Sequence, residues 1–313
     1  MKAVVYDKRR SEKFIYSDVP RPVPGDNDVL VKIHAASMNA LDYRSMRMGI
    51  IPKNKIFGAD IAGVVETVGS QVTDYCPGDK VAADISGCGL GGFAEFVAVP
   101  QSVLVKMPES VSFEDAAALP VAAETAVQAL RDKGSIKKGQ SVLVCGAGGG
   151  VGTYAVQLAK YFSAQVTAVC GSKNVDMVKA IGADIVIDYT KERFDTRKAQ
   201  YDIVVAANGS YPLSAYKRVL KPMGICVVLG GALRQIFSTM VFGPFLSIGG
   251  KKIRMLAAKP SPKDLAFHMS LVEQGKLRPV IDARYPLSET AKALDYLGRG
   301  HARGKVLITI QEG

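Results

Sequence analysis

The chain has 313 residues, 48% of them hydrophobic, which excludes a disordered protein and indicates two domains with sizeable cores. The formal net charge is +11, but lysines and arginines are spread along the chain without a basic block or a basic stripe alternating with aromatics. Direct binding of nucleic acid is therefore disfavoured, whereas a cationic surface suits a polyanionic cofactor.

Targeting signals and cysteine usage indicate the cellular compartment that we expect for this protein. The sequence has no run of about 18 apolar residues, so we expect no membrane span. The opening MKAVVYDKRR lacks the apolar stretch of a secretory signal, and we expect none. The five cysteines are scattered and never form a CxxC pair. This usage predicts a reducing compartment, the cytoplasm, and argues against a zinc site built on cysteine.

The region up to about residue 120 predicts a compact β domain. Short apolar segments recur at roughly ten-residue spacing and are separated by turns rich in proline and glycine. The predicted strands lie within residues 29–38, 59–69, 76–85 and, as a pair, 93–108. Several short strands at this spacing are typical of a small barrel.

The rest of the chain alternates strands and helices. Strands are predicted at 141–146, 165–171, 184–189, 202–208, 225–231, 278–286 and 304–310. Helices are predicted at 153–162, 174–182, 213–224, 261–276 and 288–297, the last with Ser288 as its N-cap. The alternation predicts a parallel, doubly wound α/β sheet with right-handed crossovers.

The segment CGAGGGVG, residues 145–152, joins a predicted strand directly to a predicted helix. Its spacing is that of a GxGxxG motif with Ala147 in the first place, followed by Gly149 and Gly152. Bare Cα atoms let backbone N–H groups approach a pyrophosphate, and the helix N-terminus adds partial positive charge. With Gly150 and Val151, this loop predicts the diphosphate site of a dinucleotide.

The residues at the end of the predicted strand 165–171 indicate whether the cofactor is NAD or NADP. NAD sites place an acidic residue about 20 residues beyond the glycine motif, where it binds the ribose 2′-hydroxyl. Here the place holds Gly171, Ser172 and Lys173, and Asp176 follows one turn later. A hydroxyl and an ammonium group suit a 2′-phosphate, which favours NADP(H). The alternative is an ordinary solvent-exposed turn.

With these motifs, the chain resembles the medium-chain dehydrogenase/reductase superfamily, in its zinc-free quinone oxidoreductase and enone reductase branch. The resemblance runs over essentially the whole chain and includes MKAVVYDK, MNALDYRSMRMG, FGADIAGVVETVG, CGAGGGVG and GHARGKVLITI. It implies a GroES-like β-barrel catalytic domain at residues 1–120 and a Rossmann NADP-binding domain at 121–260. Residues 261–313 are then expected to return to the catalytic domain and complete it.

The resemblance also implies that no metal is bound. Zinc alcohol dehydrogenases of this superfamily hold catalytic zinc with a cysteine, a His-Glu pair and a second cysteine. In this chain Asn39 stands at the first place, and Ala59 followed by Asp60 stands at the second. No cysteine falls in PVAAETAV, where the last ligand is expected. We expect Asp60 to pair with a neighbouring cation instead.

Three residues are candidates for the catalytic side, again by resemblance: Asn39, Asp42 and Arg44. Asn39 is expected either to donate a hydrogen bond to a carbonyl group of the acceptor or to cap a turn. Arg44 either stabilises an anionic oxygen or is a surface arginine, and Tyr43 is an alternative to it.

The resemblance implies further cofactor contacts at Thr125, Tyr189, Asn208, Gly230, Gly231 and Arg303. Asn208 and the two glycines end strands at the carboxyl edge of the sheet, where ligands of such sheets bind. Arg303, with Lys305, is expected to add positive charge near a phosphate; a solvated basic turn is the alternative.

We therefore expect an enzyme that transfers hydride from NADPH to a hydrophobic acceptor, a quinone or an α,β-unsaturated carbonyl compound. Relatives in this superfamily form dimers or tetramers, so a homo-oligomer is expected. The main alternative is an NADPH-binding structural, sensor or adaptor protein with little catalysis. Binding of RNA and zinc-dependent alcohol dehydrogenation are weaker alternatives.

Overall fold

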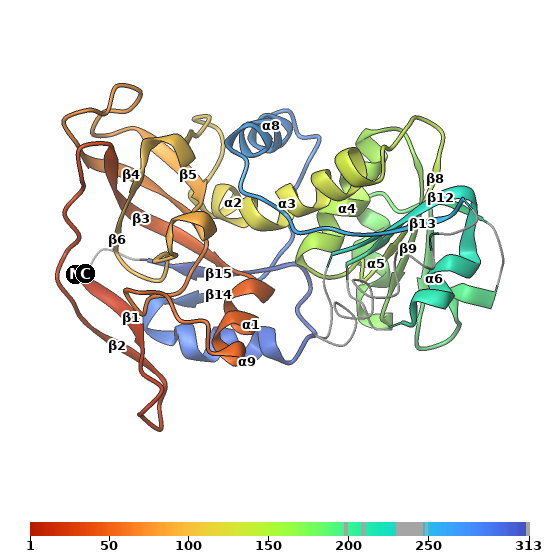
Figure 1. Ribbon diagram of the computed structural model, residues 1–313, viewed down its shortest axis with the longest axis horizontal. Coiled ribbons are helices and arrows are strands. Elements are labelled where there is room, and N and C mark those ends of the chain that lie inside the picture. Colours follow the sequence, from red (N-terminus) through yellow and green to blue (C-terminus); the bar gives the residue numbers. More distant parts are fainter. Residues whose placement is uncertain (197–199, 208–210, 230–246, 248–249, 311–313) are drawn as a thin grey trace. The chain divides into compact units, whose positions relative to one another are not determined.

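The computed structural model describes the whole chain except residues 197–199, 208–210, 230–246, 248–249 and 311–313. The chain divides into two compact units (Figure 1). The first comprises Met1–Glu124 and Pro260–Gly313, and the second comprises Thr125–Lys259. Among the residues that the structure describes, no helix is both long and apolar enough to cross a membrane.

The first unit is built on a seven-stranded sheet. Its strand order is β14-β15-β3-β4-β5-β7, with β6 paired to the other end of β3. The strands are β3 (Asp28–Met38), β4 (Asp60–Val68), β5 (Lys80–Asp84), β6 (Phe96–Pro100), β7 (Val105–Lys106), β14 (Ile281–Pro286) and β15 (Lys305–Thr309). A separate antiparallel pair is formed by β1 (Lys2–Tyr6) and β2 (Phe14–Asp18). The C-terminal strand thus lies beside β3, where Val306 is opposite Met38 (Figure 1).

Helices of the first unit are α1 (Ala40–Met48), α2 (Phe113–Ala118), α3 (Pro120–Val127), α8 (Pro262–Glu273) and α9 (Thr290–Gly298), of which α3 continues into the second unit. Helix α1 begins after Asn39 and ends at Gly49, whose φ of +73° is left-handed. The prediction that Ser288 caps a helix is wrong. Ser288 lies in a short 3₁₀ turn, and Glu289 occupies the N-cap position of α9.

The second unit is a six-stranded sheet of order β10-β9-β8-β11-β12-β13 in which every pair is parallel. The strands are β8 (Ser141–Cys145), β9 (Gln165–Cys170), β10 (Ile185–Asp188), β11 (Tyr201–Ala206), β12 (Leu220–Val228) and β13 (Lys252–Met255). Their helices are α4 (Gly150–Tyr161), α5 (Val175–Ala180) and α6 (Leu213–Val219). The near-continuous apolar strands β8, β9 and β11 in the middle of the sheet are almost completely buried. The predicted α/β fold class is confirmed.

One predicted helix is too long. The sequence predicts a helix over residues 213–224, but α6 ends at Val219 and Leu220 already belongs to β12. Pro222 is the physical reason, because it cannot donate a backbone hydrogen bond and disfavours helical geometry at the preceding Lys221.

The core of the first unit depends on close contact between β3 and β4. Side chains of Val29, Val31 and Ile33 point to one face of β3 and are almost completely buried. On β4, Gly63 faces Ile33, and a Cβ atom at residue 63 would lie 2.0 Å from the carbonyl oxygen of Lys32. Only glycine therefore allows the two strands to pair at this point.

We predict that Gly63→Ala lowers the free energy of unfolding by about 3 kcal/mol, because the backbone of β3 must move to admit a methyl group. Urea denaturation measures the change. Gly87→Ala is the matched control, since its Cβ would meet only Pro260 Cγ at 3.8 Å and should alter stability by less than about 1 kcal/mol. Equal stability of both variants would contradict the assigned pairing.

Candidate active site

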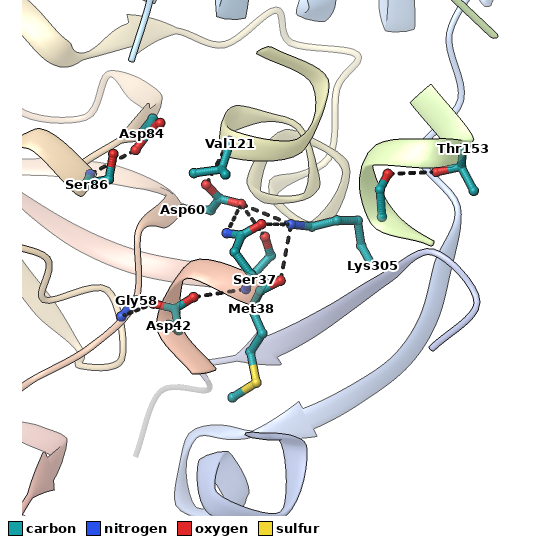
Figure 2. A network of polar contacts seen from close by, with 12 residues as sticks. Ser37, Met38, Asp42, Gly58, Asp60, Asp84, Ser86, Val121, Thr153 and Lys305 are labelled. Carbon is teal, nitrogen blue, oxygen red and sulfur yellow. Dashed lines mark hydrogen bonds and ion pairs between the residues drawn. The ribbon is translucent and has the colours of Figure 1, made fainter. Parts of the chain in front are cut away.

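A buried ion pair joins the first residue of β15 to the first residue of β4 (Figure 2). The ammonium of Lys305 donates to Asn39 Oδ1 at 2.7 Å, Asp60 Oδ2 at 3.1 Å and the carbonyl of Met38 at 3.3 Å. Both charged side chains are excluded from water, with exposures of 1% and 0%. The expectation that Asp60 pairs with a cation is confirmed. The expectation that Lys305 adds charge near a phosphate is wrong, because its ammonium is committed to this pair.

Asp60 collects hydrogen bonds from four donors. Its Oδ2 accepts from Ser37 Oγ at 2.6 Å, Asn39 Nδ2 at 2.8 Å and Lys305, and its Oδ1 accepts from the backbone N–H of Val121 at 3.0 Å. Val121 is the second residue of α3, so the carboxylate lies at the positive end of that helix. These bonds offset much of the cost of burying the charge.

Asp42 holds α1 against a neighbouring turn. Its carboxyl accepts from the backbone N–H groups of Asn39 at 2.9 Å and Gly58 at 3.0 Å, and the residue is completely buried. Burial raises the pKa of Asp42 to about 7, although these two hydrogen bonds act in the opposite direction. The structure therefore gives this predicted site residue a role in positioning α1.

Arg44 is the half-buried cation of α1. Burial lowers the pKa of its guanidinium, and it makes no hydrogen bond or ion pair within the described part of the chain. Its N–H donors are thus available to an anionic or carbonyl ligand. Tyr43, the alternative candidate, packs its ring against Gly298 of α9. The contacts favour Arg44 over Tyr43 as the ligand-binding residue.

The donor chemistry of this region does not fit a zinc ion. Of the positions that correspond to zinc ligands, residue 39 offers an amide and residue 59 only a buried methyl group. The carboxylate of Asp60 is already paired with the ammonium of Lys305, which would repel a second cation.

The glycine loop of the second unit has the geometry of an anion-binding turn. Gly146 has a φ of +82°, and Gly149 is the N-cap of α4, whose first turn contains Gly150, Val151 and Gly152. A Cβ atom at residue 152 would lie 2.0 Å from the carbonyl oxygen of Gly146. Because Gly146 and Gly152 have no side chains, the twelve-residue helix α4 can begin directly after the turn. Its N-terminal N–H groups are then placed as they are in sites that bind a pyrophosphate.

The rest of the loop is held by the sheet. Ala147 is completely buried, and its N–H donates to the carbonyl of Val169 on β9 at 3.0 Å. Thr153 donates its hydroxyl to the carbonyl of Gly150 at 3.0 Å (Figure 2). The predicted residues 147 and 149–152 therefore form the end of the turn after β8 and the first turn of α4.

The structure brings Gly171, Ser172 and Tyr189 together at the carboxyl ends of β9 and β10. A Cβ atom at residue 171 would lie 3.0 Å from the Tyr189 hydroxyl, so the tyrosine lies against the glycine. Lys173 follows in a short 3₁₀ turn with its side chain exposed to solvent.

A carboxylate that sequence analysis missed lies in this group. Ser172 donates its hydroxyl to Asp188 Oδ2 at 2.6 Å, and this bond lowers the pKa of Asp188. The serine proton is thereby already used. Asp188 ends β10 opposite Cys170 of β9, and this strand register is what brings it close to Ser172. The IDY segment at the end of a neighbouring parallel strand is the one sequence signal.

Five other predicted site residues are less informative. Thr125 is 8% exposed at the start of the second unit. Arg303 has an exposed side chain in the first unit, and its backbone N–H donates to Asp282 Oδ2 at 2.9 Å. Asn208, and Gly230 with Gly231, lie outside the described residues.

Glu124 is a further buried acid that sequence analysis missed. It is 2% exposed, its Oε2 accepts from the N–H of Ser261 at 2.9 Å, and its buried Oε1 has no hydrogen-bond donor among the described residues. Burial, reinforced by the negative charge of Asp84, raises the pKa of Glu124 to about 9. An isolated acid in the apolar stretch PVAAETAV is the sequence signal for it.

We predict that Glu124 makes the protein less stable as the pH rises. Its carboxyl stays protonated up to about pH 9 when folded but ionises above about pH 4.5 when unfolded. Unfolding therefore releases a proton between these values, and stability is lost across this window as pH increases.

The measurement is urea denaturation at about pH 5.5 and pH 8.5 of the wild type and Glu124→Gln, which keeps the shape without the charge. The wild type should lose about 4 kcal/mol more than the variant over this interval of three pH units. Parallel pH profiles for the two proteins would contradict a protonated Glu124.

A parallel doubly wound sheet with a glycine turn at a helix N-terminus, together with a β unit completed by the C-terminal segment, is typical of two-domain nucleotide-binding dehydrogenases. Residues 25–109 match the family of alcohol dehydrogenase GroES-like domains, and residues 181–308 match the family of zinc-binding dehydrogenases.

Known proteins resemble the chain over nearly its full length. A chloroplast envelope quinone oxidoreductase homolog of Arabidopsis thaliana is 37% identical over 308 residues, covering 93% of this chain and 92% of that protein. An NADPH-dependent alkenal/one oxidoreductase of the same plant is 34% identical, with coverages of 93% and 74%. The structure of the quinone oxidoreductase from Coxiella burnetii matches with a TM-score of 0.86, 27% identity and coverages of 99% and 98%.

The chain therefore belongs to the medium-chain dehydrogenase/reductase superfamily, in the branch of quinone oxidoreductases and enone reductases. This confirms the resemblance stated from the sequence.

Proposed function

We propose that this protein is an NADPH-dependent oxidoreductase that transfers hydride to a quinone or an α,β-unsaturated carbonyl compound without zinc. The observation that carries the proposal is the network of Lys305, Asp60 and Asn39, in which an amide and a carboxylate paired with an ammonium occupy positions that the family resemblance assigns to zinc ligands. The names of the relatives, a quinone oxidoreductase homolog and an NADPH-dependent alkenal/one oxidoreductase, support the acceptor class and the cofactor.

The glycine loop fits the cofactor. Backbone N–H groups at residues 149–152 would hold the diphosphate at the N-terminus of α4. Lys173 follows β9 and Tyr189 follows β10, and both would flank the adenosine ribose and its 2′-phosphate. When bound, the dihydronicotinamide supplies the hydride.

A conjugated acceptor makes a metal unnecessary. Conjugation spreads the negative charge that arrives with the hydride, so the protein has to orient the acceptor and stabilise a developing oxyanion. Two donors in the first unit suit this task, the guanidinium of Arg44 and the amide of Asn39. Water supplies the final proton.

We predict that the protein turns over a quinone panel, an enone panel or both with NADPH. The reaction is monitored as the loss of NADPH absorbance at 340 nm. A strong chelator should leave the rate within about twofold, because no protein group in this donor set requires zinc. A rate that falls on chelation and returns with zinc would contradict the zinc-free mechanism. Tight binding of NADPH without turnover of any acceptor would favour a sensor or adaptor protein.

We predict that the wild type binds NADPH at least about tenfold more tightly than NADH, equivalent to about 1.4 kcal/mol, and that Lys173→Ala removes most of this preference. Nicotinamide fluorescence titration measures both affinities. Lys179→Ala is the matched control, an exposed lysine of α5 in the same region. A wild-type preference for NADH would instead point to Asp188 as the ribose-binding carboxylate.

Two expectations from the sequence stay predictions, the cytoplasmic location and the homo-oligomer. The five cysteines are free of disulfides, three of them buried and two exposed, which supports a reducing compartment.

A further inference from the structure

The buried network around Asp60 can be examined donor by donor. Lys305 has three N–H groups and three acceptors, namely Asn39 Oδ1, Asp60 Oδ2 and the carbonyl of Met38. Ser37 gives its hydroxyl proton to Asp60. Both oxygens of Asp60 accept hydrogen bonds. The ammonium, the hydroxyl and the carboxylate are therefore fully used.

The orientation of the Asn39 amide is determined by its two charged neighbours. An ammonium can only donate, so Lys305 must face the amide oxygen, at 2.7 Å. An ionised carboxylate can only accept, so Asp60 must face the amide nitrogen, at 2.8 Å. A flipped amide would place donor against donor and acceptor against acceptor, which excludes the ambiguity usual for asparagine side chains.

One donor of the network is left over. Asn39 Nδ2 carries two N–H groups, and within the described residues only Asp60 accepts from it. Asn39 is 7% exposed, whereas Ser37, Asp60 and Lys305 are at most 1% exposed, so the residue that carries this second N–H is the one least closed to water. A buried polar group without an acceptor costs free energy, and native proteins rarely keep one unless a ligand or water fills it.

We infer that Lys305 and Asp60 are positioning residues that hold the second N–H of Asn39 for the carbonyl oxygen of the acceptor. The inference rests on the proposed function and identifies the hydrogen-bond donor of that reaction. Lys305 also polarises the amide, because a cation on the oxygen makes the amide N–H a stronger donor. The donor therefore strengthens its bond to the oxygen as negative charge develops there.

The network variants separate positioning from folding. Lys305→Met alone leaves a buried, unpaired carboxylate, so the test uses the double variant Lys305→Met/Asp60→Asn, which removes both charges at similar volume. The amide of Asn39 then faces no charge that selects its orientation. We expect kcat for an enone to fall about 100-fold in Asn39→Ala and about tenfold in the double variant, with unchanged affinity for NADPH.

The decisive result is non-additivity. The triple variant should be no slower than Asn39→Ala, because the charges act only through the amide. The control is Arg284→Met/Glu114→Gln, an exposed ion pair of the same unit, which should keep kcat within about twofold. Losses that multiply in the triple variant would overturn the inference.

A second readout does not depend on turnover. In the complex with NADP⁺, the infrared carbonyl stretch of a bound α,β-unsaturated ketone should lie lower in the wild type than in Asn39→Ala and in the double variant. An unshifted stretch in the wild type, or no bound ketone, overturns the inference. A shifted stretch without turnover of any acceptor by the wild type contradicts the proposed function and leaves the inference standing.

Discussion

The buried ion pair between Lys305 and Asp60 is the interaction on which the proposed active site of the first unit depends. It joins β15 to β4 across 245 residues of sequence, and Asp60 also holds β3 through Ser37 and α3 through Val121. Removing two charges from water is costly, and the pair is tolerable because every oxygen and ammonium hydrogen has a hydrogen-bond partner. A single network thereby aligns the four segments that surround Asn39.

The second unit solves a different physical problem, which is to bring backbone close to a polyanion. Gly152 permits a contact with Gly146 that any side chain would block, and the turn leads directly into the N-terminus of α4, the proposed site of the cofactor diphosphate. Charge is supplied there by backbone dipoles and in the first unit by a buried side-chain pair. The proposed reaction needs both, one to hold the cofactor and one to orient the donor that meets the acceptor.

Local patterns predicted much of this arrangement. The buried strands of the second unit are continuous apolar runs, and the glycine spacing after β8 is contiguous in sequence, so both were predicted from short windows. The helix predicted over residues 213–224 ends early at Val219, because Pro222 does not continue a helix. Asn39 and Asp60 are identified by the family resemblance. Lys305, which contacts both, is wrongly predicted to lie near a phosphate.

The sequence by itself determined the fold class and the glycine turn after β8, because each is encoded by residue types at short spacing. The missing zinc ligands were inferred only from the family resemblance. Only the tertiary structure decided that Lys305 joins Asp60, that Asp188 lies beside Ser172 and that Asn39 has one donor free among the described residues. These contacts depend on strand order and register across distant segments. A single sequence does not show which buried charges meet, because burial and pairing are properties of the packed chain.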